Sequence, residues 1–117
     1  MSAGDFLAGM AASSRVRADA ASAALPAAEL RARIADLPPA PKLRLSSQGF
    51  DLIAEMKLRS PAVGALRAAS EEDAGRRAGL YAAAGAAAVS VLTEPSRFDG
   101  SLAHLEQAAA AIAPAAA

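Results

Sequence analysis

The sequence DLIAEMKLRSPAVG, residues 51–64, decides the fold of this chain. Its first six residues form a short and largely apolar run, and a loop with a proline and a glycine follows them, so we expect a buried β-strand over residues 51–56. Side chains alternate along a strand, which places Ile53, Glu55 and Lys57 on one face. Glu55 and Lys57 then lie at the C-terminal end of the strand, where open α/β sheets and barrels bind their ligands.

An acid and a base at this position allow two interpretations. Two charged groups are costly to remove from water unless they are paired or used, so their placement at a strand end favours a functional site. A simple ion pair or two solvated charges would explain the same spacing equally well. The loop that follows contains the hydroxyl group of Ser60, which could shape an anion or substrate site or belong to an ordinary turn.

A second strand and two helices are expected further along the chain. Residues 86–92, AAAVSVL, have the pattern of another buried strand. The acidic stretch that begins at Ser70 predicts the start of a helix that runs to about residue 84, and Gly85 predicts its end. Ser101 is expected to cap a last helix. The order strand, helix, strand, helix is typical of a right-handed parallel βαβ unit and therefore of an α/β fold.

The first third of the chain has a different character. Residues 5–36 are rich in Ala, Leu, Arg and Glu and predict a helix that is broken near Leu25–Pro26. Pro38, Pro39 and Pro41 end the helical pattern, because proline lacks the N–H that a helix needs. The chain is thus expected to divide into a helical extension with a linker, residues 1–49, and an α/β part, residues 50–117.

Composition excludes several classes of function. The chain has 117 residues, 12 Lys and Arg against 12 Asp and Glu, no cysteine and one histidine. The balance of charges argues against nucleic-acid binding. The lack of cysteine excludes disulfide frameworks and thiolate metal sites, and a single histidine excludes a multi-histidine metal site. The sequence lacks a segment typical of a membrane span or secretory signal, so we expect a cytoplasmic protein. With 36 alanines, the core should be thin and the isolated chain only marginally stable.

The loop after the second expected strand, residues 93–100, holds two further candidates for a binding site, and the helix after it holds the single histidine. Phe98 lies among polar residues, where an aromatic ring could stack on a substrate or act as a local hydrophobic plug. Arg97 could contact an anion or be a solvated loop charge. His104, in the following helix, is interpreted as a surface or helix-packing residue, because no Ser or Asp partner lies near it in the sequence.

Two stretches together resemble a known family. Residues 51–66, DLIAEMKLRSPAVGAL, resemble the first barrel strand and loop of the indole-3-glycerol phosphate synthase family, whose motif is approximately I-A-E-x-K-x-x-S-P-S-x-G. Residues 81–105, YAAAGAAAVSVLTEPSRFDGSLAHL, resemble its second unit, Y-x-x-x-G-A-x-A-x-S-V-L-T-[DE]-x-x-x-F-x-G-S. The resemblance implies a partial (β/α)8 TIM barrel, made of the N-terminal helical extension and the first two βα units.

The resemblance also implies an activity. Members of the family are lyases of tryptophan biosynthesis that close a ring in 1-(2-carboxyphenylamino)-1-deoxyribulose 5-phosphate and decarboxylate it. By resemblance, Glu55 and Lys57 would be catalytic, while Ser60 and Phe98 would bind the substrate. The implied partner is a phosphorylated small molecule. No metal, organic cofactor, nucleic acid or membrane is implied.

Several parts of the family pattern are missing from this sequence. A full barrel takes ~250 residues, and the family's general-acid lysine, a further carboxylate and the phosphate site belong to later strands. Ala62 and Val63 also replace a Ser-Lys pair in the first loop. We therefore expect a truncated enzyme that is inactive alone. A non-catalytic binding or assembly module, one half of a split barrel, and self-association through exposed strands are the alternatives, while a purely helical interaction protein is disfavoured by the two strand-loop motifs.

Overall fold

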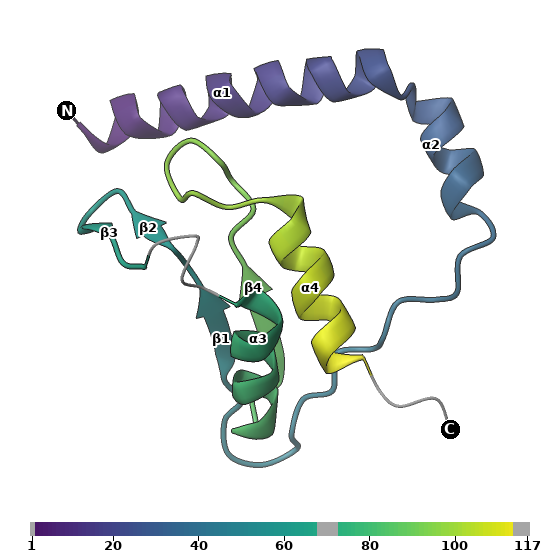
Figure 1. Ribbon diagram of the computed structural model, residues 1–117, viewed down its shortest axis with the longest axis vertical. Helices are drawn as coiled ribbons and strands as arrows, with labels where there is room; N and C mark the ends of the chain where they lie inside the picture. The colour runs from purple at the N-terminus through teal and green to yellow at the C-terminus, as the bar shows by residue number, and fades with distance from the viewer. Residues whose placement is uncertain (1, 68–72, 114–117) are drawn as a thin grey trace. The chain divides into compact units, whose positions relative to one another are not determined.

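The computed structural model describes residues 2–67 and 73–113 of the chain (Figure 1). The chain divides into two compact units, residues 1–41 and residues 42–117. The described part of the first unit is helical, and the second unit carries all the described strands together with two helices. The compact units divide between residues 41 and 42, whereas the boundary between the helical extension with its linker and the α/β part is predicted between residues 49 and 50.

The first unit consists of helix α1, Ala3–Ala24, and helix α2, Ala27–Ile34. A capping box begins α1: the Ser2 hydroxyl accepts the Asp5 N–H at 3.1 Å, and the Asp5 carboxylate accepts the Ser2 N–H at 3.3 Å. Pro26 separates the two helices, because it cannot continue the hydrogen-bond ladder of α1. The predicted break at this proline is confirmed. Neither helix contains a buried residue.

The second unit contains a parallel βαβα arrangement. Strand β1, Ile53–Met56, pairs in parallel with strand β4, Ala88–Val91. Helix α3, Ala74–Ala83, connects them, and helix α4, Leu102–Ile112, follows β4. Figure 1 shows α3 and α4 beside this two-stranded sheet. The predicted order and the parallel pairing are confirmed, although both strands are shorter and less buried than expected.

A small hairpin follows β1 that the sequence did not lead us to expect. Strands β2, Arg59–Ser60, and β3, Gly64–Ala65, are antiparallel. The backbone of Leu58 extends the pairing, since its carbonyl accepts the Leu66 N–H at 2.7 Å. Gly64 has a φ of 74°, a left-handed conformation that glycine adopts at little cost. What the composition indicated as a plain loop is thus a backbone-paired hairpin.

Side-chain caps fix the ends of the helices in the second unit. Asp73 is the N-cap of α3 and accepts the backbone N–H three residues further on at 2.9 Å. The capping signal predicted at Ser70 lies outside the described residues. Gly85, with a φ of 100°, follows the end of α3 as predicted. Ser101 caps α4 as predicted, accepting the backbone N–H three residues on at 3.2 Å.

The core of the second unit lies between the sheet and the two helices. Met56 packs there with Tyr81, Val89 and Val91, which are only partly buried. The buried hydrophobic side chains among the described residues are Met56, Leu58, Ala74, Ala78 and Ala108. Because three of the five are alanines, the core is thin, as the composition predicts.

Helices α3 and α4 meet along a seam of small residues. Ala74 and Ala78 lie one turn apart on α3, and both are almost fully buried, as is Ala108 on α4. Gly75 shares this seam, since a Cβ atom added to it would lie 3.3 Å from the backbone carbonyl oxygen of Gln107. The short side chains allow the two helix backbones to approach each other closely.

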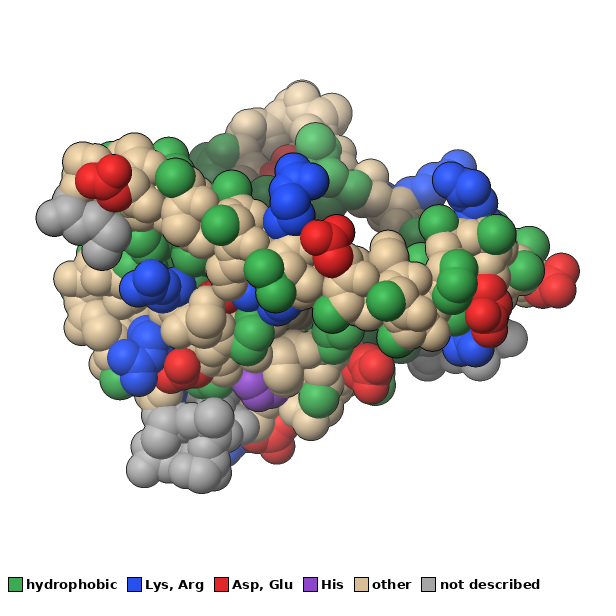
Figure 2. Space-filling view, turned by 90° about the horizontal axis from the view of Figure 1, so that it is seen from above, with side chains coloured by type: hydrophobic (Ala, Val, Ile, Leu, Met, Phe, Trp, Pro, Cys, Tyr) green, Lys and Arg blue, Asp and Glu red, His purple; other side chains and the backbone are tan. Residues whose placement is uncertain are grey.

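The face of the sheet opposite the helices is open to solvent. Met56 faces the helices, so alternation places Ile53 and Glu55 on the other face. Ile53 is 67% exposed there. Figure 2, seen from above the view of Figure 1, shows hydrophobic side chains interspersed with charged ones on the surface that faces the viewer. A buried parallel sheet needs cover on both faces, and in the described residues this sheet has helices on one.

Candidate active site

The predicted acid and base form an ion pair at the end of β1. The Lys57 Nζ atom lies 3.0 Å from Glu55 Oε1, and the two side chains are 33% and 44% exposed. Both project from the open face of the sheet, because alternation turns Met56 toward the helices. The structure therefore brings these two predicted residues into direct contact.

Ser90 holds the second oxygen of the same carboxylate. In the parallel register Ser90 lies opposite Glu55, and its hydroxyl donates to Glu55 Oε2 at 3.1 Å. The hydrogen bond from Lys57 lowers the pKa of Glu55, partial burial opposes this change, and the Ser90 hydrogen bond lowers the pKa further. Glu55 is thus kept ionised, and it holds the Lys57 ammonium group in place.

Phe98 joins this pair from the loop after β4. The Lys57 Nζ atom lies 5.8 Å from the centroid of the Phe98 ring, within the range of a cation–π contact. An ammonium group beside an aromatic face suits a ligand that is both planar and negatively charged. Three of the four predicted site residues therefore lie together.

Ser60 has a different environment. It lies on β2, and its hydroxyl accepts the Ala62 N–H at 3.3 Å. This local hydrogen bond shapes the tip of the hairpin. Ser60 is not among the described residues that line the cavity beside Lys57.

A cavity of about 480 Å3 lies at the C-terminal end of β1. Its described lining includes Glu55 as the one carboxylate side chain, together with three cationic side chains, Lys57, Arg67 and Arg77, and the imidazole of His104. The excess of basic groups favours an anionic ligand. His104, interpreted from the sequence as a surface or packing residue, is partly buried in this wall.

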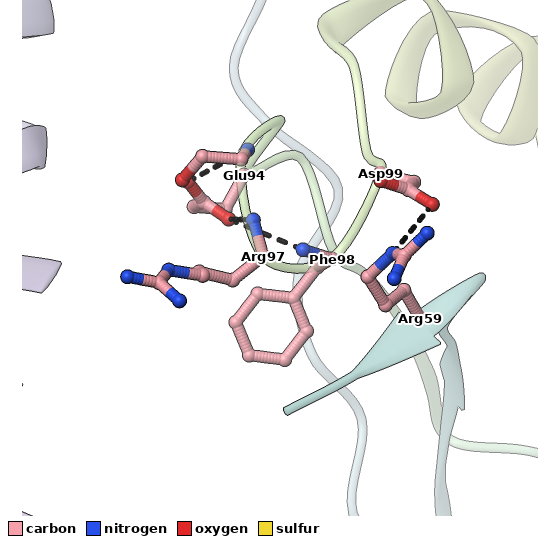
Figure 3. A network of polar contacts seen from close by, with 6 residues as sticks. Arg59, Glu94, Arg97, Phe98 and Asp99 are labelled. Carbon is pink, nitrogen blue, oxygen red and sulfur yellow. Dashed lines mark hydrogen bonds and ion pairs between the residues drawn. The ribbon is translucent and has the colours of Figure 1, made fainter. Parts of the chain in front are cut away.

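The loop after β4 is organised around one side chain, Glu94 (Figure 3). Glu94 Oε1 accepts the Ser96 N–H at 3.0 Å and the Ser96 hydroxyl. Glu94 Oε2 accepts the Arg97 N–H at 2.7 Å and the Phe98 N–H at 3.2 Å. Partial burial raises the pKa of Glu94, but these hydrogen bonds outweigh it and lower the pKa to about 2.

An ion pair connects this loop to the hairpin. Arg59 Nε on β2 donates to Asp99 Oδ2 at 2.8 Å, as Figure 3 shows. Asp99 has a φ of 53°, a left-handed conformation that aspartate tolerates better than most residues. The next residue, Gly100, is buried, and a Cβ atom there would overlap the Leu92 carbonyl oxygen. The loop returns sharply toward α4 at these two positions.

Sequence reasoning missed three contributors to this site. Ser90 could have been found because it is the one polar residue in an apolar strand. Alternation places its side chain on the other face of the strand from those of Val89 and Val91. Glu94 lies two to four residues before the N–H groups that it binds, a spacing typical of side-chain caps. The ion pair of Arg59 with Asp99 joins residues 40 apart and leaves no local signal.

The described residues offer neither a metal-binding cluster nor a membrane-spanning helix. Among the described residues, no group of three or more His, Cys, Asp or Glu side chains could hold a metal ion. Within residues 2–67 and 73–113, no helix is both long enough and apolar enough to cross a membrane.

Comparison with known proteins gives a consistent result. A sequence model described as indole-3-glycerol phosphate synthase matches residues 9–116. The indole-3-glycerol phosphate synthase of Nocardioides sp. is 48% identical over 87 residues, which cover 73% of this chain and 33% of the relative. That of Mycolicibacterium gilvum is 44% identical over 102 residues, which cover 83% of this chain and 36% of the relative.

A third relative gives a similar match. The indole-3-glycerol phosphate synthase of Methanopyrus kandleri is 48% identical over 62 residues, covering 53% of this chain and 24% of the relative. The chain thus spans about a quarter to a third of the length of these relatives. Because the family match extends over nearly all of the sequence and includes both strand-loop segments, the chain belongs to the indole-3-glycerol phosphate synthase family.

Proposed function

We propose that this chain forms the N-terminal extension, residues 1–49, and the first two βα units, residues 50–117, of a (β/α)8 indole-3-glycerol phosphate synthase. The complete barrel would close the indole ring of its phosphorylated substrate with loss of carbon dioxide and water. One observation carries the proposal: the Lys57 ammonium group is held by Glu55 and lies beside Phe98 at the C-terminal end of a parallel strand. A cytoplasmic location is part of the proposal.

The contacts of Lys57 fit the aromatic half of the substrate. The substrate carries a carboxylate on a flat ring, and ring closure needs a positive group near that carboxylate. Lys57 supplies the charge, while Phe98 offers an aromatic face at 5.8 Å from it. Glu55 is bound by Lys57 and Ser90 and keeps the ammonium group in one position. Lys57, and not Glu55, is the residue that would meet the substrate first.

The remaining requirements of the reaction fall outside this chain. An acid must activate the ribulose carbonyl group, and a clamp must hold the phosphate. The family places both on later strands, so the proposal assigns them to the rest of the barrel. Ser60 is proposed to contact the substrate from the hairpin once the barrel is closed, and the open face with Ile53 would then be covered.

A second candidate function is assembly without catalysis. The exposed Ile53 and the two unpaired strand edges in the described sheet favour strand pairing with another polypeptide. A complementary barrel fragment is the proposed partner, and a second copy of the chain is the alternative. The enzymatic and the assembly function both predict association, and only the enzymatic function predicts turnover.

A complementation assay tests the proposal. The chain is mixed with a fragment that carries strands three to eight of a family member, and formation of indole-3-glycerol phosphate is followed by its fluorescence. We expect activity in the mixture only. Lys57→Ala should lower turnover at least ~100-fold, because it removes a group that acts directly on the substrate. Lys42→Ala is the matched control, since Lys42 is exposed and is the chain's other lysine.

The outcomes separate the two functions. Equal activity of the Lys57→Ala and Lys42→Ala mixtures would contradict the role proposed for Lys57. Stable association of folded fragments without any product would instead support the assembly function.

A further inference from the structure

The loop after β4 has a feature that the proposed chemistry does not use. Glu94 is partly buried, points back into its own loop, and does not line the cavity. Its two carboxylate oxygens accept four hydrogen bonds from three consecutive residues, Ser96, Arg97 and Phe98. Figure 3 shows these contacts closing the loop around the carboxylate.

The last of these hydrogen bonds reaches the residue that contacts Lys57. The backbone N–H of Phe98 donates to Glu94 Oε2 at 3.2 Å, so Glu94 fixes the backbone from which the Phe98 ring projects. The backbone carbonyl of Glu94 also accepts the Gly100 N–H at 2.9 Å, which closes the loop on its far side. Phe98 is therefore held on both sides by contacts that begin at one residue.

From this geometry we infer that Glu94 is a positioning residue: its carboxylate pre-forms the loop of residues 93–100 and so places the Phe98 ring beside the Lys57 ammonium group. The inference rests on the proposed function for any consequence in catalysis. The positioning itself is a property of this chain and can be measured without turnover.

The carboxylate group is required because all four partners are donors. A carboxylate has two acceptor oxygens, whereas a glutamine side chain has one acceptor oxygen and one NH2 donor. In Glu94→Gln, either the Ser96 donors or the Arg97 and Phe98 donors must therefore face another donor. Hydrogen bonds to a charged group are also stronger than those to a neutral one. The substitution keeps the size of the side chain but removes its negative charge and one of its two acceptor oxygens.

Nuclear magnetic resonance of the full 117-residue chain tests the inference. The ε-methylene protons of Lys57 should show an upfield ring-current shift from Phe98, and Phe98→Leu defines the value without the ring. In Glu94→Gln this shift should fall toward the Phe98→Leu value. The Arg97 and Phe98 amide protons should exchange with solvent about tenfold faster, the factor that corresponds to one lost charged hydrogen bond.

Glu106→Gln is the matched control. Glu106 is exposed on α4, and no hydrogen bond or ion pair of its side chain is found within the described part of the chain. This variant loses the same charge and should keep the Lys57 shift and the slow amide exchange. Amide signals of β1 and β4 that match the wild type show that a variant is folded.

Two results would overturn the inference. The first is a folded Glu94→Gln variant that retains the full ring-current shift at Lys57. The second is an equal loss of the shift in Glu106→Gln, which would assign the effect to net charge. If the wild-type mixture is active in the complementation assay, the mixture with a folded Glu94→Gln chain should have a higher KM or a lower kcat. If the wild-type mixture is inactive, the proposed function fails, but the resonance test of the positioning role still stands.

Discussion

The two loops that follow the parallel strands are stabilised in different ways. The loop after β1 forms a hairpin, in which backbone groups of β2 and β3 pair with each other. The loop after β4 has no paired strands among the described residues and is organised by the Glu94 carboxylate, by one backbone hydrogen bond from Gly100 to Glu94, and by the tight turn at Gly100. A loop of the first kind tolerates changes of side chain, whereas a loop of the second kind depends on single residues.

Replacing one glycine by alanine in each loop should give the largest difference between the two loops in the free energy of unfolding. Gly100→Ala places a Cβ atom against the Leu92 carbonyl oxygen, so the backbone must move, and we expect a loss of about 3 kcal/mol in the free energy of unfolding. Gly64→Ala meets no atom within 4 Å and is penalised only for its φ of 74°, at about 1 kcal/mol. Urea denaturation followed by circular dichroism measures both, and a larger loss for Gly64→Ala would reverse the comparison.

Acid should reduce the stability that Glu94 gives to the loop after β4. The pKa of Glu94 is lowered from 4.5 to about 2, so its ionised form stabilises the folded chain above pH 4.5, and this contribution is lost as the pH falls from 4.5 toward 2. Wild type should therefore be more stable than Glu94→Gln at neutral pH, and their unfolding midpoints should converge in acid. Glu106→Gln, which removes the same charge from an exposed position on α4, is the control. A constant difference between wild type and Glu94→Gln at every pH would contradict this assignment.

The contact between the two loops should have the smallest effect. Arg59 and Asp99 are 45% and 39% exposed, and exposed ion pairs contribute about 0.5 kcal/mol. A double-mutant cycle of Arg59→Gln and Asp99→Asn measures their coupling, and asparagine retains tolerance of the left-handed φ. The coupling should decrease as salt is added. A coupling that is absent at low salt would show that the loops are held independently, and a coupling that grows with salt would contradict an ion pair as its cause.

Much of the fold could be predicted because its signals are local. The break at Pro26, the end of α3 at Gly85 and the cap at Ser101 each depend on the chemistry of one residue. The apolar runs around β1 and β4 predicted two strands, and their spacing predicted parallel pairing, but the prediction that both strands are buried was wrong, because one face of the sheet is open in the described residues. Each of these features is determined by residues close together in the chain.

The missed features depend on contacts across space or on backbone geometry. Ser90 meets Glu55 only through the register of two strands that are 35 residues apart. The β2–β3 hairpin has only two residues in each strand, too few for alternation to show. Alternation along the strand predicted that Glu55 and Lys57 share one face, whereas the place of Phe98 beside them followed from the family resemblance and not from any spacing in the sequence.

The alanine seam between α3 and α4 has a consequence for how this unit can change by mutation. Ordinary cores lose stability when large side chains are trimmed, because trimming leaves a cavity. Ala74, Ala78 and Ala108 have little to trim, so this seam is sensitive in the opposite direction. Every larger side chain must push apart two helices whose backbones already approach closely at Gly75. A saturation mutagenesis map of this seam should therefore accept glycine, alanine and serine and reject residues in order of increasing volume.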